Sequence, residues 1–557
     1  MEYTSAGVIL FNMNSKVLIV QYPEGHWGFP KGYKETEDNS LFDTAKRELK
    51  EEIDISPNFF LNTNSYYFKE CYGEKKIIYF IAFTINSNIN LCHGLNSYKW
   101  VHIKDLDKYP GFLSKQIVRK LEEVKLDNIT IVKKVNLKDN IAKTNEKVEM
   151  PPSKHAYSRL VPLQLINDNI KIENIPNTID SYYLNNLLNR VKDHCSNECF
   201  FIDADEISNC WSMVNILPAV VWKVGKVFLP GKPSGCSIGE RPMDLYLKIM
   251  KDFGFVITEN NGGFYLEKGN VGISEITLPF PSFTGTSIAI YLAILSNNTI
   301  NIHNVSIEPE IIYLISVIKN LGYKIRFDKI ARVIKFKGKT ENNGVLSVRV
   351  PFDRNVLVTR MVSDLVSYGR FEWFNKEQHY LEELLLFLRK CGFEIYSDNY
   401  RIKIVAPNQV VVQERVVLNC GHFPKICSDW QPLLVILLCH YLIPFELSDD
   451  VFENRFQIFS QLVYLNNNIV LNKKSSNKIV IDYCETSEKF GIPAEMTTST
   501  NLEFKLLNIR DAAAILIASH QSKLDIEFSN LLQFFRGYET LENVLGEKVE
   551  LYSYEKQ

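Results

Sequence analysis

The sequence LPGKPSGCSIGERP occupies residues 229–242, and an amphipathic run follows it at residues 244–250. Its glycines and prolines allow the backbone to turn sharply and to approach a ligand closely. Cys236 lies in this stretch, where Arg241 and the start of a predicted helix add positive potential that favours a reactive thiol. The alternative is a buried, inert thiol, which is a common state of free cysteines.

The same stretch resembles the cysteine loop of the UDP-N-acetylglucosamine enolpyruvyl transferases, with three additional residues at 232–234. From residue 146 onward a strand, a turn, a helix and a glycine- or asparagine-marked strand recur. The clear copies have Gly254, Gly322 and Gly392 after the helix, and weaker copies begin near Asp180, Val451 and Tyr538. The resemblance covers residues 146–557 and implies an α/β fold, a two-lobed inside-out α/β barrel built from six repeats.

Length and composition limit the domain count, the partners and the compartment that can be expected. A chain of 557 residues, with 46% hydrophobic and 23% charged residues, is typical of a globular protein with more than one domain. The formal net charge is −2 and the chain has no extended basic block, so no nucleic-acid partner is expected. The longest apolar run, residues 433–443, is too short to cross a bilayer, so no membrane partner is expected. Scattered cysteines and the lack of a recognisable signal peptide predict a cytoplasmic protein.

The first 112 residues predict a strand-rich module with one acidic helix. Residues 8–11 and 17–20 are apolar and flank a turn signal, which predicts a hairpin. The motif WGFPKG follows at residues 27–32, and the acidic helix is predicted at residues 43–52. Three carboxylates share one face of this helix, those of Glu48, Glu51 and Glu52. They form either a solvated face or a site for a hard divalent cation.

WGFPKG followed by RELKEE resembles the Nudix hydrolase signature, which implies an α/β/α sandwich and Mg²⁺ held by Glu48, Glu51 and Glu52. Gly32 and Arg47 match the signature, but the stretch between them is one residue too long. Asp54 replaces the glycine expected after the paired glutamates, and Gly94 replaces a further glutamate. These departures predict that the Nudix fold is retained while its hydrolase activity is weak or lost.

The chemistry of enolpyruvyl transfer determines which groups the larger module must supply. Phosphoenolpyruvate must be protonated at its methylene carbon while an acceptor hydroxyl attacks C2, and phosphate then leaves. The site therefore needs an acid, a base and several cations, and arginine suits phosphate and carboxylate because its fork is bidentate and always charged. No cofactor is expected for this reaction.

Family resemblance assigns these roles. Cys236 is the expected acid, Asp429 the expected base, and Lys154 a phosphoenolpyruvate contact. The expected substrate-binding residues are Ser153, Ser158, Arg159, Arg241, Ser282, Thr284, Arg354, Arg455, Arg510 and Arg536. Each has an ordinary alternative, such as a surface arginine or, for Asp429, a helix cap. One family arginine is missing, and Val214 stands in its place.

We expect a Nudix-like domain at 1–127, a linker at 128–145 and an enolpyruvyl transferase domain at 146–557. Its lobe A comprises about 146–152 and 353–557, and its lobe B about 153–352. The expected function is enolpyruvyl transfer from phosphoenolpyruvate to a nucleotide or nucleotide-sugar, beside a weak or inactive Nudix domain. The alternatives are a bifunctional enzyme whose Nudix half cleaves a nucleoside diphosphate compound, and a Nudix half that serves as a nucleotide-binding regulator.

Overall fold

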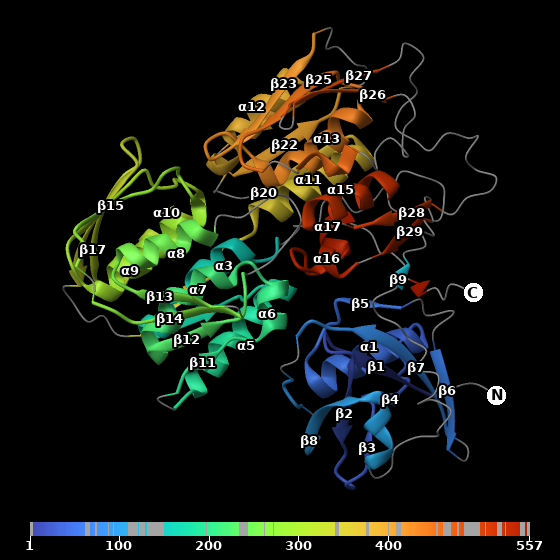
Figure 1. Ribbon diagram of the computed structural model, residues 1–557. Helices are drawn as coiled ribbons and strands as arrows, with labels where there is room; N and C mark the ends of the chain where they lie inside the picture. The colour runs from blue at the N-terminus through green and yellow to red at the C-terminus, as the bar shows by residue number, and fades with distance from the viewer. Residues whose placement is uncertain are drawn as a thin grey trace.

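The computed structural model describes residues 4–61, 67–72, 75–86, 89–92, 94–109, 121, 129–130, 150–195, 198–232, 243–260, 262–270, 272–339, 345–374, 378–398, 400–407, 414–452, 455–459, 469–475, 478–483, 502–506, 508–520, 526–529, 531–545 and 552–553. An N-terminal domain lies at the bottom of Figure 1, and a larger C-terminal domain with two lobes lies above it.

An eight-stranded mixed sheet forms the N-terminal domain, with α1 on one face. Its elements are β1 (Ser5–Phe11), β2 (Lys16–Gln21), β3 (Trp27–Gly28), β4 (Lys31–Tyr33), α1 (Leu41–Ile53), β5 (Phe59–Phe60), β6 (Tyr67–Tyr72), β7 (Lys75–Phe83), β8 (Ser97–His102) and the 3-10 helix η1 (Ile103–Lys108). The predicted hairpin is present, with Phe11 opposite Val17. Along β1, Val8 and Leu10 join the apolar cluster that includes α1, whereas Ile9 joins a cluster that continues into the C-terminal domain.

Helix α1 has a clear beginning and end. Ser40 caps its N-terminus by accepting a hydrogen bond from the backbone N–H of Asp43 at 3.1 Å. Asp54 ends the helix in the left-handed region, with φ of 51°, and its N–H donates to Lys50 O at 3.0 Å. Asp54 thus adopts the conformation for which glycine carries no steric penalty.

Part of the expected linker pairs with the end of the chain. Its residues Ile129–Thr130 form β9, which is antiparallel to β30 (Tyr552–Ser553). Residues 131–145 lie outside the described residues.

Two apolar clusters divide the C-terminal domain into two lobes. The first lobe, at the left of Figure 1, is built from α3 (Lys154–Leu160), α4 (Leu163–Ile166), β10 (Ile170–Glu173), α5 (Ile179–Asp193), β11 (Phe200–Phe201), α6 (Ala204–Asn209), α7 (Met213–Val224), β12 (Lys226–Leu229), α8 (Met243–Asp252), β13 (Val256–Asn260), β14 (Gly263–Glu267), β15 (Glu275–Thr277), α9 (Phe283–Ser296), β16 (Ile300–His303), α10 (Pro309–Asn320), β17 (Tyr323–Asp328), β18 (Val333–Lys339) and β19 (Leu346–Arg349).

The second lobe, at the top of Figure 1, contains α11 (Arg354–Tyr368), β20 (Arg370–Phe374), η3 (Gln378–Leu381), α12 (Glu382–Lys390), β21 (Glu394–Ser397), β22 (Arg401–Val405), β23 (Val416–Gly421), β24 (Ile426–Cys427), η4 (Ser428–Trp430), α13 (Gln431–His440), β25 (Phe445–Asp449), η5 (Arg455–Ile458), β26 (Ile469–Ser475), β27 (Lys478–Tyr483), β28 (Leu502–Lys505), α15 (Ile509–His520), β29 (Ile526–Ser529), α16 (Leu532–Phe535) and α17 (Glu542–Leu545). The chain passes between the lobes at two adjacent places, where Pro152 pairs with Phe352. Asp353 N donates to Pro151 O at 2.8 Å beside this pair.

Three sheets of the C-terminal domain share one topology. Their strand orders are β11-β12-β14-β13, β15-β16-β18-β17 and β23-β25-β27-β26, the last with β24 added at its edge. In each sheet the first two strands are parallel and the others pair antiparallel. The helices α7, α9 and α13 join the parallel pairs, and most of their largely apolar residues are buried.

The glycines that mark the sequence repeats end three helices in the same way. Gly254, Gly322 and Gly392 have φ of 92°, 87° and 89°, a region that side chains strongly disfavour. After Gly254, Phe255 N donates to Met250 O at 3.0 Å, which closes the helix and starts the next strand.

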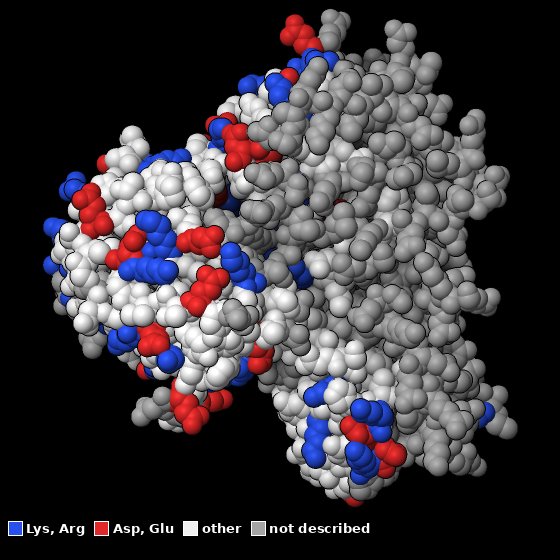
Figure 2. Space-filling model, in the orientation of Figure 1, with Lys and Arg blue, Asp and Glu red and all other residues white. Residues whose placement is uncertain are grey.

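The described surface carries mixed charges. Figure 2 shows Lys and Arg interspersed with Asp and Glu over the first lobe, at the left of the view. Within the described residues, no helix combines the length and apolarity needed to span a membrane.

Candidate active site

A cavity of about 480 Å³ lies between the two lobes. The start of α3, the start of α9 and the side chain of Tyr246 border it from the first lobe. From the second lobe it is bordered by η4, η5 and the starts of α11 and α15. Of the residues predicted for the site, Lys154, Ser158, Arg159, Ser282, Thr284, Arg354, Asp429, Arg455, Arg510 and Arg536 line this cavity.

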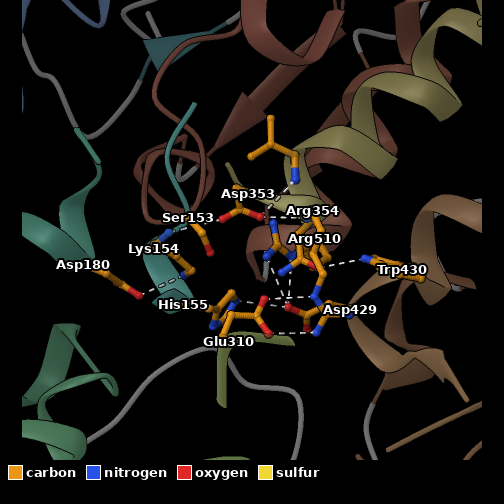
Figure 3. Close-up of polar contacts among 12 residues, drawn as sticks. Ser153, Lys154, His155, Asp180, Glu310, Asp353, Arg354, Asp429, Trp430 and Arg510 are labelled. Carbon is orange, nitrogen blue, oxygen red and sulfur yellow. Dashed lines mark hydrogen bonds and ion pairs between the residues drawn. The ribbon is translucent and has the colours of Figure 1, made fainter. Parts of the chain in front are cut away.

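Asp429 is bound by two of the arginines that line the cavity. Its carboxylate accepts hydrogen bonds from Arg455 and from Arg510, whose Nη2 is 3.2 Å from Oδ2. His155 Nε2 lies 3.6 Å from the same oxygen (Figure 3). Burial raises the pKa of Asp429, but Arg510, His155 and Arg455 outweigh burial and hold this pKa well below its usual range. The carboxylate therefore balances the arginines and does not cap α13, which has no side-chain cap bond.

Lys154 belongs to a second buried group. Its Nζ donates to Asp180 Oδ2 at 3.0 Å and to the backbone oxygen of Arg536 at 3.1 Å. Arg536 Nε donates to Asp180 Oδ1 at 3.2 Å. Burial raises the pKa of Asp180, but Lys154 and Arg536 outweigh burial and the pKa is lowered. Asp180 thus fixes two predicted anion-binding cations at the edge of the cavity.

Arg354 begins α11 and crosses from the second lobe to the first. Its guanidinium donates to Glu308 and to Glu310, the latter at 2.9 Å from Nε. Burial lowers the pKa of Arg354, but the two glutamates outweigh burial and raise it well above its usual value. The neighbouring Asp353 caps α11 and also accepts the backbone N–H of Lys154 at 3.3 Å. These contacts join the lobes at the wall of the cavity (Figure 3).

The remaining predicted residues mainly shape the first lobe. Ser153 caps α3 by accepting from Ala156 N, and Ser282 caps α9 by accepting from Gly285 N. Arg159 lies over the ring of Phe283, with its guanidinium carbon 3.2 Å from the ring centre. Burial lowers the pKa of Arg159 to about 10, and the nearby Tyr291 and the carboxylates of Glu310 and Glu308 offset burial only in part.

Some buried polar atoms in the cavity have no hydrogen-bond partner within the described residues. Among them are Nε of Arg455, Nη1 of Arg354 and Oδ1 of Asn215. Because buried polar groups are nearly always satisfied, these atoms indicate that the cavity takes a polar ligand. The two arginine nitrogens are donors and require an acceptor, which a phosphate or carboxylate provides.

Sequence reasoning missed several residues of this site. Asp180, Glu308 and Glu310 hold the cations, but their partners are far away in sequence, with 44 residues separating Glu310 from Arg354. Val214 is buried in α7, while Asn215 beside it faces the cavity. Glu308 and Glu310 lie at a predicted helix start, which is the only feature of the sequence that marks them. A carboxylate at such a position is equally consistent with a helix cap.

Cys236 and Arg241 lie outside the described residues. The segment that contains them is bordered by Lys232 and Met243. Lys232 Nζ is 3.3 Å from Asp244 Oδ1 in the first turn of α8. Tyr246, in the same turn, lines the cavity.

In the N-terminal domain the three predicted metal glutamates extend from α1. Arg47 Nη1 lies 2.9 Å from Glu48 and 2.8 Å from Glu51, and Arg47 also pairs with Asp38. Glu52 is buried and accepts the backbone N–H of Lys31 at 3.1 Å. Burial raises the pKa of Glu52 to about 8 and raises that of Glu48.

These carboxylates fit a hard cation in their chemistry, because oxygen ligands suit Mg²⁺. Gly32 approaches Glu48 so closely that a Cβ atom there would collide with its carboxylate. The arrangement differs from a metal site, since Arg47 holds two of the three glutamates. No group of three His, Cys, Asp or Glu side chains in the described part of the chain is placed as metal ligands.

Comparisons with known proteins match both halves of the chain. The family described as EPSP synthase (3-phosphoshikimate 1-carboxyvinyltransferase) matches residues 139–417, and the NUDIX domain family matches residues 1–121. UDP-N-acetylglucosamine 1-carboxyvinyltransferase from Kosmotoga olearia is 27% identical over 58% of this chain and 73% of its own. The protein of the same name from Elusimicrobium minutum is 26% identical over 73% of this chain and 96% of its own.

Solved structures show the same fold. The enolpyruvyl transferase NikO from Streptomyces tendae matches with a TM-score of 0.61 and 16% identity, over 76% of this chain and 98% of its own. EPSP synthase from Acinetobacter baumannii matches with a TM-score of 0.51 and 12% identity, over 76% of this chain and 99% of its own.

Proposed function

The chain belongs to the EPSP synthase family of carboxyvinyl transferases, whose model covers half of its length, and we propose that it moves an enolpyruvyl group from phosphoenolpyruvate to a hydroxyl of a nucleotide or nucleotide-sugar. Phosphate is the second product. The observation that carries this proposal is the meeting of Arg455 and Arg510 around Asp429 in one interlobe cavity, which Arg354 also lines. Such a cluster suits a small ligand with a phosphate and a carboxylate.

Asp429 is the proposed base for the acceptor hydroxyl. Without substrate its pKa is held low, because Arg510 and Arg455 are bound to it. When the anions of phosphoenolpyruvate engage these arginines, part of that positive charge is neutralised and the pKa of Asp429 rises. The carboxylate becomes a stronger base only when the donor is in place.

Cys236 is the proposed acid that protonates the methylene carbon. The sequence of its loop supports this role, and so does the position of Tyr246 on the cavity wall shortly after that loop. Lys154 and Arg536 would bind the anionic donor, with Asp180 fixing their positions. In the tetrahedral intermediate the bond between C2 and the phosphate oxygen then breaks while the methyl group returns a proton to the Cys236 thiolate, which restores the enol double bond. Nearby cations stabilise the leaving phosphate.

The acceptor is proposed to lie on the first-lobe side of the cavity. Trp211, Tyr246, Phe280 and Phe283 line it there, beside the start of α9 and its Thr284. Aromatic side chains suit a base or a sugar ring, and the α9 N-terminus suits a phosphate. The relatives named for UDP-N-acetylglucosamine support a nucleotide-sugar.

We further propose the domain bounds 1–127, 128–145 and 146–557, with six repeats forming a two-lobed inside-out barrel. The three sheets of shared topology and the chain crossing at Pro152 and Phe352 support this division. The cytoplasm is the proposed compartment, because phosphoenolpyruvate is the proposed donor.

The N-terminal half is proposed to be a weak or inactive Nudix domain. Glu48, Glu51 and Glu52 would hold Mg²⁺, which when bound polarises a diphosphate. The ion pairs of Arg47 with Glu48 and Glu51 favour low activity, since two ligands are engaged elsewhere. The second candidate, a bifunctional enzyme, is favoured by the buried Glu52, and a nucleotide-binding regulator remains the third.

Phosphate release from phosphoenolpyruvate tests the proposal. The full chain would be incubated with phosphoenolpyruvate and a panel of UDP-sugars, nucleotides and phosphorylated cyclitols. We expect phosphate release with at least one nucleotide or nucleotide-sugar and none without an acceptor. Release that is confined to a cyclitol, or that needs no acceptor, would overturn the proposal.

A further inference from the structure

The two domains touch through Asn58 and Phe59, at the start of β5 in the N-terminal domain, and the segment 535–539 of the second lobe. β5 is the strand of the lower domain nearest to α16 in Figure 1. Segment 535–539 contains Arg536, which lines the candidate active site. The contact therefore joins the Nudix-like domain to a cation of the transferase site.

Asn58 makes a buried polar bond across this contact. Its Nδ2 donates to the backbone oxygen of Glu539 at 2.7 Å. Its Oδ1 accepts the backbone N–H of Ile85 at 2.7 Å, which fixes the orientation of the amide. Only 5% of Asn58 is exposed, so loss of either bond would leave a buried group unsatisfied.

A column of aromatic rings runs beside this bond. Phe59 stacks on Phe83 within its own domain, with ring centres 5.1 Å apart, and on Phe535 of the second lobe at 5.3 Å. Phe535 contacts Phe534 edge to face, and Phe534 stacks on Tyr538 at 4.7 Å. Close-packed rings transmit a displacement, because the interior has little free volume.

The far end of the column reaches the anion-binding groups. Arg510 lies over the ring of Tyr538 at 5.3 Å, and the Tyr538 hydroxyl is 2.9 Å from Thr359 Oγ1. Between Phe535 and Tyr538, the backbone oxygen of Arg536 accepts from Lys154.

Glu539 continues the same path. Its Oε1 accepts the N–H of Asn177, just before the cap of α5, and α5 carries Asp180. Asn58 thus fixes the backbone of Glu539, and the side chain of Glu539 binds the start of α5. That helix carries Asp180, the counterion of Lys154.

We propose that the Nudix-like domain is a structural part of the transferase site, with Asn58 and Phe59 as positioning residues for Arg536 and Lys154. This inference rests on the proposed function only in taking phosphoenolpyruvate as the ligand of these cations. A domain attached merely through its linker would need no buried polar bond and no ring stack at the segment that carries Arg536. The role requires no hydrolase activity, which accounts for a Nudix-like domain whose metal glutamates are bound by Arg47.

The test uses the full chain and three variants. Asn58→Asp keeps the acceptor for Ile85 but places an oxygen against the Glu539 carbonyl. Phe59→Leu removes the ring that touches Phe535. Phe60→Leu is the matched control, because the neighbouring Phe60 packs on Phe42 inside the N-terminal domain, with ring centres 4.8 Å apart.

Three measurements decide the outcome. We expect Asn58→Asp and Phe59→Leu to speed amide hydrogen exchange in residues 531–545 and to weaken calorimetric binding of phosphoenolpyruvate by roughly 2- to 30-fold. The kcat at saturating phosphoenolpyruvate should change less than this affinity does, and Phe60→Leu should match the parent protein in all three.

Exchange and affinity that are the same in Asn58→Asp, Phe59→Leu and Phe60→Leu would overturn the inference. If the parent protein neither binds nor consumes phosphoenolpyruvate, the proposed function fails. Hydrogen exchange alone then decides whether Asn58 and Phe59 hold segment 535–539.

Discussion

Arg510 Nη2 lies 3.2 Å from Oδ2 of Asp429, so the proposed base and a proposed anion-binding cation neutralise each other in the protein without substrate. Arg455 contacts the other carboxylate oxygen. The substrate anions must compete with Asp429 for both arginines, which couples donor binding to activation of the base.

Asp429→Asn should lower kcat by about 100-fold or more, because it removes the group that takes the acceptor proton. The KM for phosphoenolpyruvate should stay the same or fall, since the arginines lose an internal competitor. Steady-state kinetics over both substrates measures the two effects. A raised KM with an unchanged kcat would reassign Asp429 to binding.

Arg510→Lys should raise the KM for phosphoenolpyruvate by about 10-fold or more, because a lysine cannot replace the bidentate fork. Arg190→Lys is the matched control, since Arg190 pairs with Asp203 and Glu206 and does not line the cavity. Equal KM values for the two variants would remove Arg510 from the anion site.

Asp180→Asn should destabilise the protein by about 3–5 kcal/mol at pH 7, since it leaves two buried cations without their counterion. The folded pKa of Asp180 is lowered, so its stabilising effect is present above the unfolded pKa near 4 and is lost as pH falls through the folded pKa. The gap between parent and variant should therefore shrink below about pH 4.

Urea unfolding between pH 3 and 7 would measure this gap, with Asp203→Asn as a surface control. Asp203 pairs with Arg190 but is exposed, so its loss should cost about 1 kcal/mol or less. A gap that widens in acid would contradict the depressed pKa of Asp180.

An epoxide phosphonate that mimics phosphoenolpyruvate should alkylate Cys236, and Cys236→Ala should lose most transfer activity. The thiols of Cys210, Cys391 and Cys420 should not compete, because they are buried and burial raises their pKa. Cys427 lines the cavity, but desolvation raises its pKa to about 12, so it should stay unlabelled as well. Cys195 is exposed and serves as an internal control that a general alkylating agent should label. Peptide mass analysis that finds the phosphonate on Cys195 and not on Cys236 would sink the assignment.

The N-terminal half of the full chain should bind a nucleoside diphosphate with Mg²⁺ but hydrolyse it slowly. Glu52→Gln should weaken this binding, because it removes a cation ligand. The exposed Glu24→Gln should not. Brisk hydrolysis that Glu52→Gln abolishes would favour the bifunctional enzyme instead.

Three helix ends, and the motif residues that line the cavity, could be predicted from the sequence. Gly254, Gly322 and Gly392 end their helices with positive φ, a backbone demand that local sequence expresses directly. Asp429, Arg455 and Arg510 come from motifs, and the structure brings them together in one cavity.

The partners of these residues could not be predicted, because ion pairing depends on the tertiary fold. Asp180 appears in the sequence only as a residue near a helix start, yet it holds Lys154 and Arg536. Asn58 and Glu539 are 481 residues apart, and neither belongs to a motif. Local patterns describe helices and turns, whereas contacts of this range require the folded chain.

The most direct test of enolpyruvyl transfer uses phosphoenolpyruvate with heavy oxygen at the bridge between C2 and phosphorus. Attack of the acceptor on C2 breaks the carbon–oxygen bond, so the account predicts the label in the released phosphate and an acceptor heavier by one enolpyruvyl group. Mass spectrometry of both products gives the answer. Unlabelled phosphate, with pyruvate as the other product and an unmodified acceptor, would show phosphate-ester hydrolysis and contradict the account.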